Sequence, residues 1–252
     1  METKLRDKFT RLWDRYFPAA ELPLAFYFIN DVSDMELSPP TEGLKCFATD
    51  LLRVRRGECI AFHKEALGCP GARKYLGFSQ KHSEEIDHFL AGGLPGVIEG
   101  IRYKKNLELA TESMKNLPEF KAPGKYAVWK RWDLLQTTDS PEVVVFFAQP
   151  DVLSGLFFLA NYDRAESTGV HSPFASGCAS MVMYPHIEKH AEKPRAVIGM
   201  FDPSARQYLS DKLLTFSVPM NRFLEMIENM EESFLGTKTW SKLSRRIKRT
   251  HS

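Results

Sequence analysis

Apolar residues recur with helical spacing along much of the chain. The first predicted helix covers residues 2–17. Leu5, Phe9 and Leu12 fall on one of its faces, and most of its Lys and Arg residues lie off that face. Pro18 ends the pattern, because proline lacks a backbone donor and cannot continue a helix. Similar spacing predicts further helices over residues 44–54, 70–77, 82–91, 103–117, 151–160, 204–215 and 219–235.

Shorter runs rich in β-branched and aromatic residues predict strands. The strongest covers residues 142–148, because its Val-Val-Val-Phe-Phe run suits a strand and would pack poorly on a helix surface. The other predicted strands or extended segments are residues 24–29, 58–63, 125–135, 170–174 and 196–201. Since helices and strands are mixed along 252 residues, we predict an α+β fold. It would be one compact domain with a mixed or antiparallel sheet and helices packed on it.

The order of these elements repeats in two halves, residues 18–124 and 125–235. Each half has an aromatic-rich strand, an Asp-containing turn, a helix, a short extended segment and then a Gly-Cys turn, at Cys69 and Cys178 respectively. The repeat predicts a degenerate duplication whose two Gly-Cys turns face one shared cavity. The alternative is that strand and helix order repeats by chance. Residues 236–252 form a basic C-terminal tail.

Composition excludes several classes of protein. The 34 Lys and Arg nearly balance the 32 Asp and Glu, so a nucleic-acid partner is not expected. Four cysteines are too few for a disulfide scaffold, and the apolar runs are too short to span a membrane. The charged N-terminus lacks the apolar core of a secretory signal. We therefore expect a cytoplasmic protein with reduced thiols, whose partners are a small molecule or a redox protein.

Two of the cysteines stand where helices are predicted to start. Cys69 and Cys178 each follow a glycine and precede a helical pattern or a short run of small residues. A thiol at a helix N-terminus lies at the positive end of the helix dipole, which favours the thiolate. That form binds metals and attacks electrophiles. We expect Gly68, Gly71 and Gly177 to let the backbone approach a bound cofactor closely.

Three thiols form the candidate metal site. Cys46, Cys69 and Cys178 lie on separate predicted loops, and dispersed cysteines of this kind can ligate an iron–sulfur cluster or another thiophilic metal. Three ligands would leave one iron of a 4Fe–4S cluster open. The alternative is simple packing, since cysteine is among the most buried residue types. Packing is the preferred interpretation for Cys59, which lies inside an apolar strand pattern.

Two functions without a metal stay open. A small-molecule-binding module would use an aromatic cavity between the halves, lined by Phe62, Phe146, Phe147 and Phe174. A thiol enzyme would use Cys69 or Cys178 as its nucleophile, with a nearby histidine as base. The candidate bases are His63 and His171.

Histidines supply a weaker set of metal ligands. Glu85 and His88 have the Glu-x-x-His spacing of di-iron bundles, and His186 and His190 are spaced i, i+4. Charged helices with such pairs more often face solvent, and a second Glu-x-x-His is missing. The thiols therefore remain the preferred ligands.

Several segments in a fixed order resemble a known family. They are residues 67–73 (LGCPGAR) with Gly77-Phe78, 141–148 (PEVVVFFA), 159–162 (LANY) and 176–178 (SGC). The chain thereby resembles the uncharacterised ArCR proteins, domain-of-unknown-function family 169. The resemblance implies a prokaryotic cytoplasmic protein whose cysteine pattern maps onto Cys46, Cys69 and Cys178. It supplies no reaction. The family often has Cys-x-Gly-Gly where this chain has Cys69-Pro-Gly-Ala72. This chain therefore lacks the second glycine, which would allow a ligand to approach the backbone closely at position 72.

Overall fold

A mixed β-sheet forms the centre of the molecule. The computed structural model describes residues 1, 3–32, 35–40, 42–43, 45–80 and 84–251. In that part of the chain seven strands pair in the order β2-β5-β1-β6-β9-β8-β7. Neighbours are antiparallel apart from β7, which runs parallel to β8. The strands are β1 (Leu24–Ile29), β2 (Ile60–Phe62), β5 (Tyr126–Arg131), β6 (Val143–Ala148), β7 (Val170–His171), β8 (Ala196–Gly199) and β9 (Leu214–Pro219).

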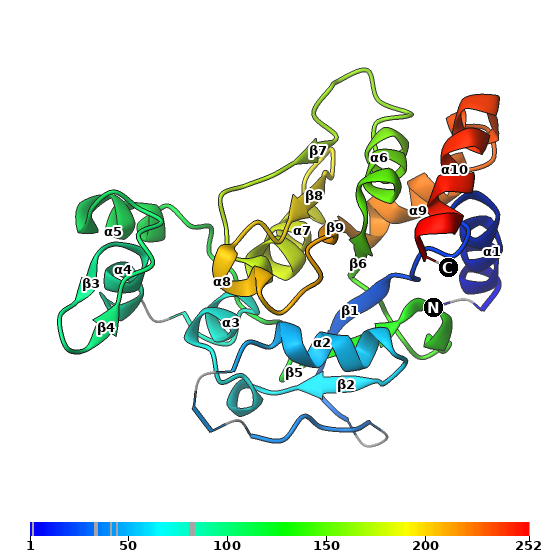
Figure 1. The fold of residues 1–252 in the computed structure, drawn as a ribbon. Coiled ribbons are helices and arrows are strands. Elements are labelled where there is room, and N and C mark those ends of the chain that lie inside the picture. The colour runs from blue at the N-terminus through cyan, green and yellow to red at the C-terminus, as the bar shows by residue number, and fades with distance from the viewer. Residues whose placement is uncertain (2, 33–34, 41, 44, 81–83, 252) are drawn as a thin grey trace.

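Helices cover both faces of the sheet (Figure 1), so the predicted α+β class is confirmed. The helices are α1 (Thr3–Tyr16), α2 (Ala48–Arg55), α3 (Pro70–Tyr75), α4 (Glu84–Leu90), α5 (Leu107–Lys115), α6 (Pro150–Leu159), α7 (Tyr184–Glu188), α8 (Pro203–Arg206), α9 (Met220–Asn229) and α10 (Lys238–His251). A π-helical segment, Ala179–Met183, directly precedes α7. Within the described residues, no helix combines the length and apolar character required to cross a bilayer.

Alternating side chains of the sheet build two separate cores. Along β6, Val144 and Phe146 point to the face covered by α1, α6, α9 and α10, which we call the α1 face. Val143, Val145 and Phe147 point to the face covered by α2, α3 and the π-helical segment, which we call the α3 face. All six residues of β6 are buried, because a central strand with helices on both sides has no solvated face. The position of β6 at the centre of the sheet explains why its sequence is a continuous apolar run.

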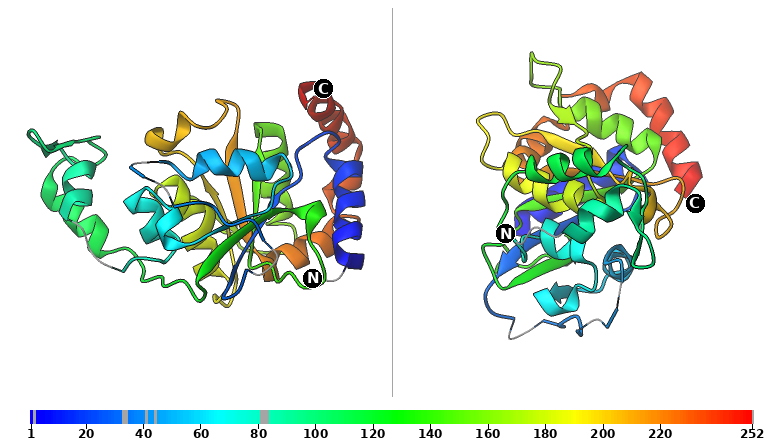
Figure 2. Two further views of the ribbon diagram at one scale, coloured as in Figure 1. Left: turned by 90° about the horizontal axis from the view of Figure 1, so that it is seen from below. Right: turned by 90° about the vertical axis from the view of Figure 1, so that its left-hand side faces the viewer.

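A small lobe projects from this body (Figures 1 and 2). It contains α4 and α5 together with a two-stranded antiparallel sheet of β3 (Gly93–Leu94) and β4 (Ile98–Glu99). Tyr103 joins the lobe to the body, because its hydroxyl donates to Asp202 Oδ1 at 2.9 Å. The lobe therefore lies next to the loop that precedes α8.

The segment between residues 204 and 215 differs from its prediction. A helix was expected there, but α8 ends at Arg206 and the interior strand β9 begins at Leu214. Thr215 and Ser217 in β9 are fully buried, although polar residues at alternate positions usually mark a solvated face. Because these two residues are polar, the sequence pattern did not predict a central strand here. The basic tail is also corrected, since most of it forms helix α10.

The predicted duplication is not confirmed. The strand order has a repeat in it, since β2-β5-β1 on one side of the sheet mirrors β8-β9-β6 on the other. The helices do not follow this repeat: α2 packs on the α3 face, whereas α6, its expected counterpart, packs on the α1 face. The two Gly-Cys turns differ as well, as described below. β5 also lies in the second predicted half, residues 125–235, so neither the strands nor the helices follow the predicted halves.

Candidate functional site

Cys69 stands at the N-cap of α3, as the sequence predicted. Its backbone is extended, with φ −84° and ψ 125°, and Pro70 occupies the first helical position, where a missing N–H costs nothing. Gly71 lies beside the thiol, because a Cβ at that position would be 3.6 Å from Cys69 Sγ. This is ordinary contact, so the fold does not require glycine there. Gly68 lies in the turn before α3.

Cys178 occupies a different position from Cys69. The helical run begins at Gly177, and Cys178 itself has helical angles, with φ −62° and ψ −43°. Cys178 therefore stands at a helix start, as predicted, but inside the first turn and not in the extended N-cap conformation of Cys69. A Cβ at Gly177 would lie 2.5 Å from Met200 Sδ, so a side chain there would displace the end of the buried Met200 side chain. None of the three glycines predicted to approach a cofactor has a positive φ.

The helix that carries Cys178 contains an irregularity. A π-helical segment follows the thiol directly, and such insertions in helices occur frequently at functional sites. Ser180 secures this segment, because its hydroxyl donates to Gly177 O at 2.9 Å and accepts from Met200 N at 3.3 Å. Met200 has a positive φ of 66°, which is uncommon for a residue with a side chain. The segment under Cys178 is thus held by β8 and the turn after it.

Cys46 lies in the loop before α2. The predicted helix over residues 44–54 begins only at Ala48, and its first residue, Leu44, lies outside the described residues. The Cys46 carbonyl accepts from the Thr49 hydroxyl at 2.7 Å and from Thr49 N at 3.1 Å, which fixes the backbone at the start of the helix. The thiol is half-buried.

The three thiols gather on the α3 face. Cys178 is buried in the core of that face, and Cys46 and Cys69 pack against the same core. The pKa of the Cys178 thiol is raised well above its ordinary value, by burial first and then by Cys69, Cys46 and Asp202. Burial also raises the pKa of Cys46, and Cys69 and Asp202 add to this rise while the backbone N–H of Ala48 opposes it. Thiols from three separate elements therefore lie close enough to influence one another.

Acidic and phenolic groups surround the thiols, and the sequence did not point to them. Asp202 Oδ1 accepts from Tyr103 Oη at 2.9 Å, from Ser204 N at 3.0 Å and from Ser204 Oγ at 2.7 Å. Burial raises the pKa of Tyr75, and Cys178 is the next largest cause. Asp202 had a visible signal, since Asp-Pro-Ser is a common helix start, but its closeness to the cysteines depends on the fold.

Cys59 is separate from this group. It lies just before β2 and packs against the core of the opposite, α1 face of the sheet. Burial raises the pKa of its thiol, and Lys130 opposes this while Asp139 adds to it. The fourth cysteine is thus a natural control for any property of the other three.

No assembled metal site is present among the residues described. Within that part of the chain, no three His, Cys, Asp or Glu side chains are gathered as ligands of a single ion. The thiols of Cys46, Cys69 and Cys178 share one region without forming the tight shell of a mononuclear centre. Binding of a metal would require the loop with Cys46 or the turn with Cys69 to adjust.

A comparison with protein-family models gives the identity of this fold. The model described as Uncharacterised ArCR, domain-of-unknown-function family 169, matches residues 19–229. The chain belongs to the uncharacterised ArCR family. No curated protein and no solved structure matches it significantly. All three gathered thiols of this ArCR chain lie inside the matched range, whereas α1 and α10 lie outside it.

The aromatic cavity expected between the halves does not form. Phe62 and Phe147 are buried in the core of the α3 face, whereas Phe146 belongs to the α1 face. Phe174 is exposed, and Lys104 Nζ lies over its ring, 4.0 Å from the ring centroid. Adjacent residues of one strand point to opposite faces, so Phe146 and Phe147 cannot line one cavity.

The histidines proposed as bases bind elsewhere. His63 Nδ1 contacts Glu65 Oε2 at 2.9 Å, and His171 Nε2 lies 3.6 Å from Glu188 Oε1. Burial lowers the pKa of His171, and Arg195 adds to this effect. His63 is therefore within hydrogen-bond distance of a carboxylate, whereas His171 lies beside one without a hydrogen bond, and neither of these contacts involves Cys69 or Cys178.

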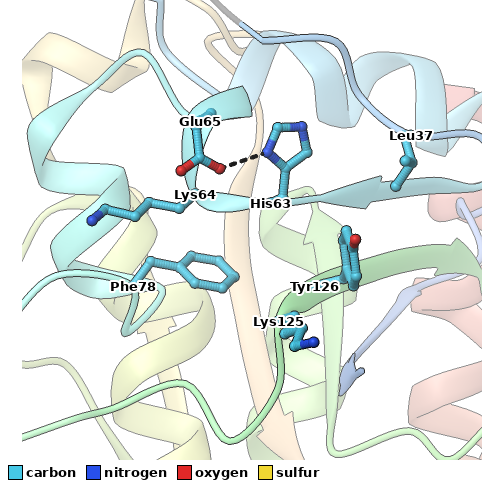
Figure 3. A pocket seen from close by; sticks show the side chains of 7 residues that line it. All are labelled: Leu37, His63, Lys64, Glu65, Phe78, Lys125 and Tyr126. Atoms are coloured by element: carbon cyan, nitrogen blue, oxygen red, sulfur yellow. Dashed lines mark hydrogen bonds and ion pairs between the residues drawn. The ribbon is translucent and has the colours of Figure 1, made fainter. Parts of the chain in front are cut away.

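A surface recess of about 470 Å³ lies around His63 (Figure 3). Apolar and charged side chains line it together, and none of its lining residues is a cysteine. The lining residues are Leu37, His63, Lys64, Glu65, Phe78, Lys125 and Tyr126. The recess is therefore a separate feature from the three gathered thiols.

A second polar cluster surrounds His186 in α7. His186 Nδ1 lies 3.2 Å from Glu142 Oε2, and the Lys189 ammonium donates to the same oxygen at 2.9 Å. The imidazole also packs against two aromatic rings, tilted against Phe120 at 4.9 Å and edge-on to Phe28 at 5.9 Å between ring centroids. His190 stands 5.9 Å away, but these residues form an ion-pair network rather than a set of metal ligands.

Acidification is expected to destabilise the protein through His186. Burial lowers the pKa of His186 from 6.5, Lys189 and His190 add to this, and Glu142 opposes it only in part. Below pH 6.5 the unfolded chain therefore binds more protons than the folded protein, and the free energy of unfolding falls as pH falls. Denaturant titrations at several pH values measure this slope. His186→Gln should flatten it, whereas His88→Gln in the lobe should not; equal slopes in both variants would contradict the assignment.

Proposed function

We propose that this ArCR protein binds a thiophilic metal centre, foremost an iron–sulfur cluster, through Cys46, Cys69 and Cys178. The observation that carries the proposal is that three thiols from separate segments pack against one core on one face of the sheet, where Cys69 raises the pKa of both Cys46 and Cys178. Thiolates are the ligands of iron–sulfur clusters, and three of them hold a cluster with one open iron.

The negative groups near the thiols favour the binding of a cation. Besides burial, other thiols and the carboxylate of Asp202 raise the pKa of both Cys46 and Cys178, and Asp50 also raises that of Cys46. Deprotonation of these thiols would concentrate negative charge in a region that water reaches poorly. A bound metal cation supplies the compensating charge, and binding would release the thiol protons.

The same surroundings argue against a thiol nucleophile. Reactive cysteines have a lowered pKa because Lys, Arg, a protonated His or a metal stands beside them. The pKa of the buried Cys178 thiol is raised instead, and the candidate base His171 has its Nε2 3.6 Å from Glu188 Oε1. The thiols are better suited to holding a metal than to attacking a substrate without one.

A cluster fits the three thiols better than a single ion does. A mononuclear zinc site draws four ligands within about 2.3 Å of one point, and no such group exists among the described side chains. A cluster places inorganic sulfur and iron between its protein ligands, so the thiolates stay further apart. The open iron would take a small molecule, or the centre would exchange electrons with a partner protein.

Anaerobic reconstitution tests this proposal. The metal-free protein is titrated with ferrous iron and sulfide, and the sulfur-to-iron charge-transfer absorbance is followed. Wild type and Cys59→Ser should develop the same band with bound iron and sulfide in equal amounts. The triple variant Cys46→Ser, Cys69→Ser, Cys178→Ser should develop none while keeping a cooperative thermal transition. A band of equal strength in the triple variant, or none in the wild type, would overturn the proposal.

A further inference from the structure

The basic charge of the chain is concentrated in two helices. Helices α1 and α10 contain eleven of the 34 Lys and Arg but only two of the 32 Asp and Glu. The rest of the molecule is therefore net acidic. The net charge of the whole chain is close to zero only because its basic and acidic residues lie in different regions. Both helices lie outside the range matched by the family model and at the same edge of the molecule, on the right in Figure 1.

Helix α10 presents a narrow basic stripe. Lys238, Lys242, Arg245 and Arg249 are all exposed, and their spacing of i, i+4, i+7 and i+11 places them on one side of the helix. They extend over about 16 Å of the helix axis. Like charges three or four residues apart destabilise a helix. α10 contains no Asp or Glu, and Asp151 of α6 pairs with Arg246 outside the stripe, so an anion bound along the stripe would offset the remaining repulsion.

The apolar side of α10 is already used inside the protein. Ile247 and Trp240 are buried, and Trp240 Nε1 donates to Tyr16 O at 2.9 Å. Gly155 leaves room for this packing, because a Cβ there would lie 2.6 Å from the ring of Phe17 and would also overlap Trp240. A helix that inserts into a bilayer needs a free apolar face, and α10 has none to offer.

Exposed aromatic rings lie near the start of α10, and a chain of ring contacts links them to the buried Trp240, on the side of the helix opposite the stripe. Trp240 contacts Phe234 at 5.3 Å between ring centroids, Phe234 contacts Phe158 at 5.8 Å, and Phe158 contacts Phe157 at 6.0 Å. Phe158 is 60% exposed and Phe157 is 40% exposed. In α6 and the turn after it, the exposed large apolar residues are aromatic, with Tyr162 as the third.

We infer that the basic stripe of α10 and the exposed rings of Phe157 and Phe158 bind single-stranded nucleic acid without regard to sequence. Lys and Arg would contact successive phosphates, and the rings would stack on bases, the combination typical of single-strand binding surfaces. The all-aromatic character of the exposed patch favours stacking over insertion among lipid chains. The inference does not depend on the metal centre, because the thiols lie on the other face of the sheet.

Fluorescence anisotropy with a labelled oligothymidine of about 20 nucleotides tests the inference. The logarithm of the binding constant should fall against the logarithm of salt concentration with a slope of about −3, as expected for four phosphate contacts on a single strand. The variant with Gln at Lys238, Lys242, Arg245 and Arg249 should bind about tenfold more weakly or worse, with a shallower slope. Phe158→Ala should weaken binding about fivefold or more.

A matched control removes the same charge elsewhere. Four exposed lysines in or near the lobe and before β9 are replaced by Gln, namely Lys105, Lys115, Lys121 and Lys212. This control should bind the oligonucleotide as the wild type does. Equal losses in both variants, no binding at about 50 mM salt, or unchanged affinity in Phe158→Ala would overturn the inference. So would binding to phosphatidylserine vesicles without binding to the oligonucleotide, which would assign the surface to a membrane.

Discussion

Serine in place of Cys69 or Cys178 is expected to lower the affinity for a thiophilic metal by about 100-fold or more, beyond the usual effect of changing an outer-shell residue. Each substitution removes one of only three thiolates, and the hydroxyl that replaces it is a poor ligand for a soft metal. A cadmium titration followed by thiolate-to-metal charge-transfer absorbance measures the effect. The same loss is expected for Cys46→Ser.

Cys59→Ser is the matched control for these variants. Cys59 is half-buried like Cys46 and Cys69 but packs against the opposite face of the sheet. Its replacement should leave the absorbance and the affinity for cadmium unchanged. If Cys59→Ser weakens binding as strongly as Cys69→Ser does, the metal binds to scattered thiols and the three-cysteine site is wrong.

Gly199→Ala is expected to destabilise the fold by about 3 kcal/mol, the upper end of the usual cost of overpacking a core. A Cβ at Gly199 in β8 would overlap the Cβ and Oγ of Ser180, and it would lie 3.3 Å from Thr215 Oγ1. Ser180 belongs to the π-helical segment after Cys178 and holds both Gly177 and Met200. The extra methyl would therefore push the segment beside the thiols away from the sheet.

Gly92→Ala supplies the comparison, because a Cβ at Gly92 would meet nothing within 4 Å. Chemical denaturation should show a lowered unfolding free energy for Gly199→Ala and a nearly unchanged value for Gly92→Ala. Metal affinity should fall in Gly199→Ala as well. Equal stability of the two variants would show that the sheet and the π-helical segment are not packed as tightly as described.

Local patterns predicted the elements whose chemistry is simple. The strand of residues 24–29 and the central strand near residues 142–148 were found because apolar β-branched and aromatic runs suit buried strands. Pro70 marked the start of α3 for an equally local reason, since proline suits the first helical position. The α+β class followed from these elements.

Features that depend on tertiary structure were not predicted. Strand β9 was missed because Thr215 and Ser217 are buried polar residues, and no local rule marks them as interior. The helical state of Cys178 and the π-helical segment depend on packing against Met200. The role of Asp202 beside the thiols depends on how the turn after β8 meets α3. Cysteine positions suggested which thiols share one face of the sheet, but not what surrounds them.

The metal content of anaerobically purified protein tests the central claim most directly. The proposed centre predicts iron and acid-labile sulfide in equal amounts with the wild type and with Cys59→Ser, and neither with the triple serine variant of Cys46, Cys69 and Cys178. A wild-type protein that carries no metal after anaerobic purification and takes up none on reconstitution would contradict the claim. So would iron and sulfide that persist in the triple variant.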